Sequence, residues 1–500
     1  MAENRRNRDD SVSRRRYLAG LTAGSIGGVA GCLGGGNGGN GNGDGGNGDG
    51  SSGNGNGDGG NGDGDDTSNQ GGEVHYLTDY NNEEWQNRWE DEITPRFEEE
   101  YDWSLRVEYT GLQGKGRNRL ATLRQSGDSP EVFTAGMYQI GDLLLGGSME
   151  SVSDVVDELE DSLGSMMGRS SIQVGGEDYL MPHGAYAQTF VYRQDIYDEL
   201  GLEVPETWDE LIENARAIDE ADDIEARGYG LSAVREGKVH EEFSNYLRNA
   251  GGGRYRWADG QEGEEAEIWV DQDHAYAVLD LFEELMQYSP DPTSISWTPF
   301  LDYWSSGRIA QGMHLNAQVA GVAYSSGEEE IARNTGVARI PMREGADPID
   351  RGRNNIDGHA VISGAEATEG AKQLHLDMYA DSANAADIAL IEPMRFIPPF
   401  LGLLEQEEYQ QAEIFQVADG HFLDLNQTVL NDIMPYLEGG DEAGDRARTA
   451  ATIYTNSFPI EGNLVNGVLI QERDRDEVYE ETISMYEERL AEGKELASDS

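Results

Sequence analysis

The chain has 500 residues, with 36 Lys and Arg against 96 Asp and Glu, and its formal net charge at pH 7 is −60. This charge excludes nucleic acids and anionic lipid surfaces as favoured partners, because both would repel the protein. A folded domain so charged also repels itself in dilute salt, whereas in molar salt the Debye length falls to about 3 Å and screens the repulsion. The composition therefore predicts a protein of very salty water, as in halophilic archaea.

The N-terminus has the pattern of an export signal followed by a lipid-attachment site. Arg14, Arg15 and Arg16 precede a weakly apolar run over 19–30, which ends at Cys32, the single cysteine of the chain. A transmembrane helix is the alternative, but it needs roughly 20 apolar residues. We therefore expect residues 1–31 to be a twin-arginine lipoprotein signal and Cys32 to carry the lipid. The mature protein would then be held at the extracellular face of the membrane, without disulfides.

Residues 32–72 consist mainly of Gly, Asn and Asp, so they have nothing with which to form a core. They predict a disordered tether, with an end-to-end distance of about 35 Å for a flexible chain of this length. Calcium binding by the repeated Asn, Gly and Asp is a weaker alternative, because the spacing is not that of a metal-binding repeat.

Beyond residue 73 the pattern becomes that of a folded body. All eight Trp and all but one of the 23 Tyr lie there, which argues against a disordered acidic chain. Apolar periodicity predicts strands at 74–77, 105–109, 131–134, 309–315, 336–341 and 358–363, and helices at 83–100, 117–125 and 140–145. Thr207 followed by Glu210 predicts a capping box at the start of a helix. Helices should dominate from 365 onwards, with the longest over 465–491. This alternation predicts an α/β protein with mostly parallel sheets covered by helices on both faces.

Several segments, in order, resemble one known family. Residues 179–218 contain Pro182, Tyr192 and a Gly-Leu-x-x-Pro-x-Thr-Trp-x-Glu-Leu run from Gly201, and they resemble the central segment of the solute-binding proteins of ABC importers, of the sugar-binding, maltose-binding-protein-like type. The segments 123–136, 300–321, 336–342 and 358–363 resemble further parts of this family. The resemblance covers roughly 74–400.

The resemblance implies a two-lobed fold with a ligand cleft. It implies one lobe over 73–185 plus about 340–395, and a second lobe over about 186–339 plus 396–500. The chain would cross between them near 182–190, 341–358 and 393–399. In open α/β sheets, ligands bind beyond the carboxyl ends of the strands, and hinge closure around the ligand is common in such proteins.

The implied function is a solute receptor that performs no chemistry, takes no cofactor or metal, acts as a monomer and delivers a small polar ligand, with a sugar favoured, to the membrane subunits of an ABC permease. Family position puts a set of aromatic and amide side chains at the cleft: Tyr80, Asn81, Tyr138, Gln139, Tyr186, Asn316, Gln318 and His359. Sugar sites combine such rings and planar polar groups. This chain departs from many sugar binders at 316–318, where Asn-Ala-Gln replaces a Trp.

The sequence also allows other ligands and functions. Lys115, Arg117 and Arg119 enter a helix from a Gly-rich turn and would suit a phosphate or carboxylate, and Arg395 lies near the third crossing. The alternatives to a sugar receptor are a receptor for iron or an anionic solute, a secreted glycoside hydrolase, and a sensor lipoprotein. Asn426-Gln427-Thr428 is a glycosylation sequon. The eight His show no metal-binding spacing, so zinc or copper is not expected.

Overall fold

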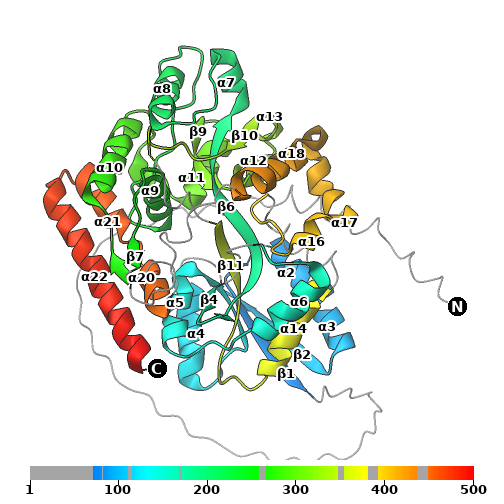
Figure 1. The fold of residues 1–500 in the computed structure, drawn as a ribbon. Helices are drawn as coiled ribbons and strands as arrows, with labels where there is room; N and C mark the ends of the chain where they lie inside the picture. Colours follow the sequence, from blue (N-terminus) through cyan, green and yellow to red (C-terminus); the bar gives the residue numbers. More distant parts are fainter. Residues whose placement is uncertain are drawn as a thin grey trace, which may run out of the picture.

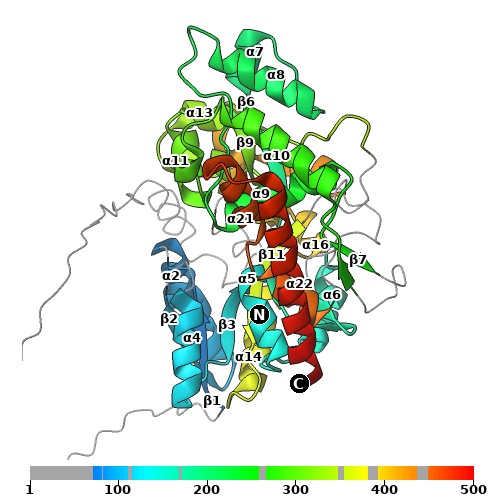
Figure 2. The same cartoon turned by 90° about the vertical axis from the view of Figure 1, so that its left-hand side faces the viewer.

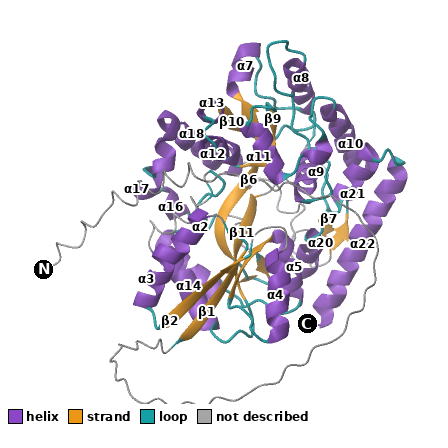
Figure 3. Ribbon diagram, turned by 180° about the vertical axis from the view of Figure 1, so that it is seen from behind, coloured by secondary structure: helices purple, strands orange, loops and turns teal. Residues whose placement is uncertain are grey.

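The computed structural model describes residues 71–81, 83–110, 115–167, 172–257, 266–346, 354–380, 392, 394–435 and 449–499. The signal, Cys32 and all but the last two residues of the predicted tether lie outside these ranges. The described elements form two groups, one below and one above in Figure 1, and the strands β6 and β11 run between them. The view from behind in Figure 3 shows the same two groups and the same connecting strands. We call them the first and second lobe.

The first lobe contains the predicted alternation of strands and helices. Its elements are β1 (Gly72–Thr78), α2 (Glu83–Arg88), η1 (Trp89–Ile93), α3 (Thr94–Glu100), β2 (Trp103–Tyr109), α4 (Lys115–Ser126), β3 (Val132–Gly136), α5 (Met137–Leu145), α6 (Ser153–Leu163), the hairpin β4 (Gln173–Val174) and β5 (Glu177–Asp178), β11 (Asn354–Val361) and α14 (Thr368–Ala380). The predicted helix over 83–100 is present as α2, η1 and α3 in succession. It buries Trp85, Trp89, Ile93 and Phe97, the four residues whose spacing predicted it.

The second lobe follows β6 along the chain. Its elements are α7 (Gln194–Leu200), α8 (Trp208–Asp219), α9 (Gly237–Asn249), β7 (Tyr255–Trp257), β8 (Ala266–Ile268), α10 (Gln272–Met286), η3 (Pro292–Ser294), α11 (Trp297–Ser305), β9 (Gln311–Leu315), α12 (Gln318–Ser325), α13 (Glu329–Arg333) and β10 (Thr335–Ala338). The predicted capping box is confirmed at the start of α8, where Thr207 accepts from the Glu210 backbone and the Glu210 side chain accepts from the Thr207 backbone.

Helices make up the C-terminal part, as predicted. They are α16 (Leu401–Leu404), α17 (Glu407–Gln410), η4 (Glu413–Gly420), α18 (His421–Thr428), η5 (Val429–Ile433), α20 (Ala450–Asn456), α21 (Glu461–Val465), η6 (Asn466–Ile470) and α22 (Arg475–Asp499). The single helix expected over 465–491 is wrong: η6 ends at Ile470, and Glu472 has a φ of 53° before α22 begins. A residue in the left-handed region cannot continue an α-helix, and apolar periodicity carries no signal for it.

The C-terminal helices contact both lobes. A Cβ on Gly141 of α5 would lie 2.5 Å from the Cα of Tyr454 in α20, so these two helices touch through their backbones. Glu461 of α21 pairs with His240 of α9, and at 2.6 Å with Arg254. In Figure 2, α22 runs along the side of the molecule past elements of both lobes. The end of the chain therefore connects the two lobes from outside.

One seven-stranded sheet extends through both lobes, in the order β10-β6-β11-β3-β1-β2, with β9 also paired to β6. β1 pairs in parallel with β2 and β3, but β11 and β6 pair antiparallel with each other, and so do β11 with β3 and β6 with β9 and β10. The expectation of mostly parallel sheets is therefore wrong. β6 and β11 pass from one lobe into the other, and each is antiparallel to the strands with which it pairs.

β6 (Met181–Arg193) is the element shared by both lobes. Its 13 residues are all buried except Arg193. Residues Met181–Ala187 pair with β11 in the first lobe, whereas Gln188–Tyr192 pair with β9 in the second. A buried strand of this length needs partners along both edges, and here each lobe supplies part of them.

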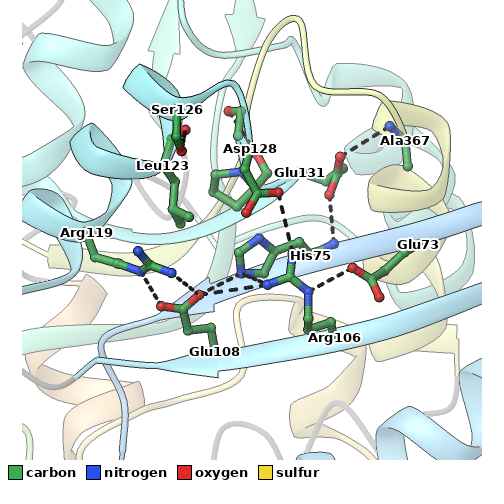
Figure 4. Close-up of polar contacts among 12 residues, drawn as sticks. Glu73, His75, Arg106, Glu108, Arg119, Leu123, Ser126, Asp128, Glu131 and Ala367 are labelled. Carbon is green, nitrogen blue, oxygen red and sulfur yellow. Dashed lines mark hydrogen bonds and ion pairs between the residues drawn. The ribbon is translucent and has the colours of Figure 1, made fainter. Parts of the chain in front are cut away.

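A charged network covers one end of the first-lobe sheet, beside α4 (Figure 4). Arg119 donates to Glu108 at 2.5 Å, and Glu108 also lies 3.2 Å from His75. Arg106, on β2 like Glu108, donates to Glu73 of the neighbouring strand β1 at 2.8 Å. Hydrogen bonding to Arg119 lowers the pKa of Glu108, so this carboxylate stays ionised. The network fastens β1, β2 and α4 together.

Three histidines lie in a row inside the first lobe. His183, His359 and His375 are each 0% exposed, and their ring centroids are 5.7 and 5.8 Å apart in that order. His359 Nδ1 lies 3.0 Å from the Tyr76 hydroxyl, whereas the ring nitrogens of His375 have no hydrogen-bond partner among the described residues. Burial and the nearby Arg395 lower the pKa of His183 to about 3. Burial and the nearby Lys372 lower the pKa of His375 to the same value. The row is therefore neutral at pH 7.

This row predicts acid sensitivity. The unfolded chain protonates these rings near pH 6.5 and the folded chain does not, so stability is complete above that pH and falls as the pH drops towards 3. Between pH 6.5 and 5 the free energy of unfolding should fall by about 2 kcal/mol for each ring.

Urea unfolding in molar salt at several pH values measures the slope of the unfolding free energy against pH. His375→Leu should make the slope shallower than that of the wild type by about one proton. An H375L slope equal to that of the wild type would contradict the assignment.

Candidate functional site

Three segments of the chain meet at the middle of β6. The segment 394–397 lies against β6, where Ala185 and Ile397 exchange two backbone hydrogen bonds of 2.9 Å. Next along the same edge of β6, the end of β9 joins the strand, because the Asn316 backbone N–H donates to Ala187 O at 2.9 Å. β11 pairs with the same stretch of β6 in the first lobe. The residues near 186 therefore lie where the two lobes join.

Asn316 holds these segments together. Its Oδ1 accepts from the Ala187 N–H at 2.8 Å, and its Nδ2 donates to the Arg395 carbonyl at 2.5 Å. Thr189 Oγ1 donates to the Asn316 carbonyl at 2.6 Å. Asn316 has a φ of 43°, a left-handed conformation that Asn tolerates better than most residues. Its side chain is thus occupied by the backbone of the crossing segments.

A compact polar cluster lies beside this junction, on the first-lobe side. Arg395 Nη2 donates to Asp357 Oδ2 at 2.7 Å, and Nη1 donates to Glu392 Oε2 at 2.5 Å. The Tyr80 hydroxyl donates to Asp357 Oδ2 at 3.0 Å, and the Tyr186 hydroxyl reaches Asp357 Oδ1 in a long 3.5 Å contact. The charged side chains keep between 14% and 19% of their surface exposed, so solvent reaches the cluster.

Aromatic rings enclose the charges. The Arg395 guanidinium lies 4.6 Å from the centre of the Phe396 ring and 5.7 Å from that of Tyr186. Tyr80 stacks on His183 at 5.5 Å with 22° between the ring planes. These contacts are cation–π and stacking interactions, which fix the orientation of each group. The guanidinium of Arg395 is therefore held between ring faces and two carboxylates.

The electrostatics of the cluster are set by burial and by its own charges. Burial raises the pKa of Tyr80, and Asp357 raises it further, so this hydroxyl stays protonated and donates. Burial opposes the charge on Arg395, but Glu392, Tyr80 and Asp357 raise its pKa well above the usual value. Two carboxylates therefore neutralise one guanidinium, and the cluster carries a small net negative charge.

The second lobe supplies an indole ring at the start of α11. Trp297 is half-buried, and it packs against the apolar cluster that includes Tyr186 and Leu315. Behind it, Lys238 Nζ lies 5.4 Å from the Trp297 ring centre and donates to Glu242 Oε1 at 2.6 Å. Both side chains of this ion pair are fully buried. A buried pair holds its neighbours in place even where its net contribution to stability is small.

The structure distributes the residues predicted from the sequence over several environments. It brings Tyr80 and Tyr186 together on Asp357. The Asn316 side chain bonds to the backbone where the lobes join, and His359 is buried in the first-lobe core. Asn81 is exposed after β1, and Gln318 is half-buried at the start of α12. Tyr138 and Gln139 lie in the first turn of α5, and their side chains are outside the described set.

Asp357 and Trp297 were not predicted from the sequence. Asp357 is one of 96 acidic residues, so only its contacts distinguish it. Trp297 could have been noticed as an isolated Trp after a turn rich in Ser, Pro and Asp, a place where a large ring has little local reason to be.

Two of the three basic residues that suggested an anion site at 115–119 are paired with carboxylates. Arg117 forms an ion pair with Asp142, and Arg119 forms one with Glu108. Lys115 is exposed at the start of α4. Among the described residues, no group of three or more His, Cys, Asp and Glu is arranged to hold a metal ion. In the same part of the chain, no helix combines the length and the hydropathy that a membrane span requires.

The sequon lies beside a separate hollow in the second lobe. A pocket of about 440 Å³ is lined mainly by apolar side chains of α16, α17, α18 and η5, with Asn426 in its wall. Asn426 is 5% exposed, and its Nδ2 donates to the Tyr409 hydroxyl at 3.1 Å. The nitrogen that would accept a glycan is therefore already used in the folded protein.

A family model for bacterial extracellular solute-binding proteins matches residues 81–375. The mannitol-binding protein of Pseudomonas aeruginosa is 29% identical over 238 residues, which cover 45% of this chain and 51% of that protein. The match thus spans about half the length of this curated relative. Members of this family bind solutes and are not enzymes.

Solved structures of two solute-binding proteins have the same fold. A solute-binding protein of an ABC transporter from Thermotoga lettingae, bound with alpha-D-tagatose, aligns with a TM-score of 0.62 at 17% identity, over 84% of this chain and 99% of that chain. The GacH receptor of Streptomyces glaucescens aligns with a TM-score of 0.64 at 15% identity, over 84% and 98%. At such identities the likeness shows the two-lobed fold alone.

The role of Asn316 predicts a graded loss of stability. Asn316→Ala removes two side-chain hydrogen bonds and puts a Cβ-bearing residue without polar support at positive φ, so we expect a loss of about 2–4 kcal/mol. Asn316→Gly should lose about 1 kcal/mol less, because glycine adopts this φ freely. Urea unfolding in molar salt measures both. Asn334→Ala, which removes a local surface bond at the end of α13, is the control and should stay within about 0.5 kcal/mol of the wild type. Equal losses for N316A and N316G would argue against the conformational part of this account.

Burial of Asn426 predicts an unoccupied sequon. When the folded protein is offered to a glycosylating enzyme, the peptide that contains Asn426 should keep its unmodified mass in mass spectrometry. The same chain offered in denaturant should be modified, which serves as the positive control. A glycan on Asn426 of the folded protein would show that the Tyr409 contact opens.

Proposed function

We propose that this chain, which belongs to the family of bacterial extracellular solute-binding proteins, captures a neutral polyhydroxylated solute between its lobes and delivers it to an ABC permease. The observation that carries the proposal is the cluster of Tyr80, Tyr186, Asp357 and Arg395 beside the middle of β6. It offers hydrogen-bond donors, a carboxylate acceptor and ring faces at one place, which is what hydroxyl groups and the apolar faces of sugars require.

A sugar or a sugar alcohol fits this cluster better than an anion. The guanidinium of Arg395 is already neutralised by Asp357 and Glu392, so an anionic solute would have to displace a carboxylate. Hydroxyl groups instead donate to the carboxylate and to the tyrosine oxygens, and one of them can accept the Tyr186 proton in place of its long contact with Asp357, without breaking the ion pairs. The mannitol-binding relative supports the sugar alcohol within this class.

Trp297 gives the second lobe a means to close on the ligand. The ring belongs to α11, and it packs against the same apolar cluster as Tyr186. We propose that a ligand held by the first-lobe cluster gains contact with Trp297 when the lobes approach, so that the closed state binds more tightly. The side chains of Asn81, Tyr138, Gln139 and Gln318 would extend the contact surface, whereas Asn316 and His359 would support it from the backbone and the core.

We further propose the arrangement in the cell that the N-terminal pattern suggests. Lipid on Cys32 would anchor the protein at the outer face of the membrane, with 32–72 as a tether, in an organism of high salinity. The lobes would be 73–185 plus about 340–395, and about 186–339 plus 396–500, with α20 in contact with the first lobe. The protein would act as a monomer. Mass spectrometry of the N-terminal peptide from membranes of the native host tests the lipid.

Calorimetry in molar salt tests the solute class. The full mature chain is titrated with D-mannitol, D-sorbitol, maltose, glycerophosphocholine, inorganic phosphate and ferric citrate. We expect a neutral polyol or sugar to bind, and at a hundred times its Kd it should stabilise the fold by about 2.7 kcal/mol. Binding of only phosphate compounds would favour the anion receptor, and a visible tyrosinate absorption band with ferric citrate would favour the iron receptor. Either result would contradict the proposal.

A variant pair assigns the binding to the cluster. Asp357→Asn removes the charge that Arg395, Tyr80 and Tyr186 share, so affinity should fall at least tenfold, or by about 1.4 kcal/mol. Asp377→Asn is the matched control: its carboxylate is 2% exposed and pairs with Arg96 at 2.7 Å elsewhere in the first lobe. D377N should lower stability and leave the Kd unchanged. Unchanged affinity in D357N would place the binding site elsewhere.

A further inference from the structure

Gln188 occupies a distinctive position in β6. It is the first residue of that strand to pair with β9, opposite Leu315, directly after the residues that pair with β11. Side chains on one face of a strand recur every second residue, so Gln188 points to the same side as Tyr186. Leu315, its cross-strand partner on that face, packs in the apolar cluster with Tyr186 and Trp297. Gln188 therefore lies between the two sets of residues that would hold a ligand.

The Gln188 amide is buried and unsatisfied. The residue is 1% exposed, and neither Nε2 nor Oε1 has a hydrogen-bond partner within the part of the chain that the structure describes. A buried amide without partners is costly, and in proteins such a group is completed by an ordered water, an ion or a bound ligand, or has a functional task. The orphaned amide is therefore an observation independent of the cluster around Arg395.

Gln311 provides an internal comparison. It lies on β9, pairs with Tyr192 of β6 and is 0% exposed. Its Oε1 accepts from the Tyr197 hydroxyl, and its Nε2 donates to the Leu211 carbonyl at 3.4 Å. The fold thus gives both polar atoms of one buried glutamine of this strand pair a partner, and leaves both polar atoms of the other, at the junction of the lobes, without one among the described residues.

We propose that Gln188 is a specificity-determining residue whose side-chain amide binds two hydroxyl groups of the solute, donating through Nε2 and accepting through Oε1. The inference rests on the proposed function and names the chemistry that the site selects: neighbouring hydroxyls of a neutral polyol or sugar. A hydroxyl both donates and accepts, so it suits either amide atom. A carboxylate or a phosphodiester would satisfy Nε2 but would face Oε1 without a proton to donate.

The test compares Gln188→Met with Gln311→Met, using D-mannitol as the probe. Methionine has nearly the length of glutamine and no strong hydrogen-bonding group. Calorimetry gives the Kd, and thermal unfolding of the ligand-free chain in molar salt gives the Tm. Q188M should weaken binding 10- to 100-fold and leave the ligand-free Tm unchanged or raised, because an unsatisfied amide is removed. Q311M should lower the Tm and leave the Kd within twofold.

A series of monodeoxy-mannitols supplies a readout that a purely structural role would not move. The wild type should lose at least tenfold in affinity for the analogue that lacks the hydroxyl read by Gln188, and Q188M should bind that analogue and D-mannitol equally. Gln188→Glu, a second variant of the same shape, should also discriminate poorly, because its carboxylate cannot donate.

The outcomes separate the two proposals. Wild-type affinity for D-mannitol with unchanged affinity in both Q188M and Q188E would overturn the role of Gln188 and leave the proposed function standing. A Tm loss in Q188M equal to that in Q311M, with discrimination among the deoxy analogues preserved, would also overturn it and would make Gln188 a structural residue. Failure of the wild type to bind D-mannitol or any neutral polyol or sugar would overturn both.

Discussion

The structure depends on one strand that both lobes share. β6 is buried along all but its last residue, and its pairing changes from β11 to β9 between Ala187 and Gln188. At about 3.3 Å per residue, 13 residues extend over roughly 40 Å, enough to pass from one lobe into the other. Because side chains alternate along a strand, Tyr186 and Gln188 lie on one face at this change of partner. The contacts proposed for the ligand follow from that geometry.

The junction is also the place where we propose that the lobes move relative to each other. Three segments cross it, and Asn316 links two of them through the Ala187 N–H and the Arg395 carbonyl. The same Arg395 carries the guanidinium that organises Asp357 and Glu392. Movement of the segment at 394–397 and placement of the polar cluster are therefore coupled through one residue. A ligand that contacts both lobes would stabilise one arrangement of these segments, which is the thermodynamic requirement for closure on binding.

Much of the fold could be predicted from the sequence, but most of the site could not. The helix over 83–100 and the box at Thr207 and Glu210 depend on local spacing, and both are present. Strand direction depends on partners distant in sequence, so the antiparallel pairing of β6 was missed. The acidic composition concealed Asp357, and the interruption of the C-terminal helix at Glu472 follows from a single backbone angle. Gln188 was missed because an amide within a buried strand shows its significance only when its partners are counted.

The most direct test of the account is a crystal structure of the full mature chain grown in molar salt with D-mannitol, or with the neutral sugar or polyol that binds most tightly. The account predicts density for the solute between the lobes, with hydroxyls within hydrogen-bonding distance of Asp357 and of both amide atoms of Gln188, and with Trp297 against its carbon skeleton. Density confined to the pocket beside Tyr409 and Asn426, or a solute that touches only one lobe, would contradict it.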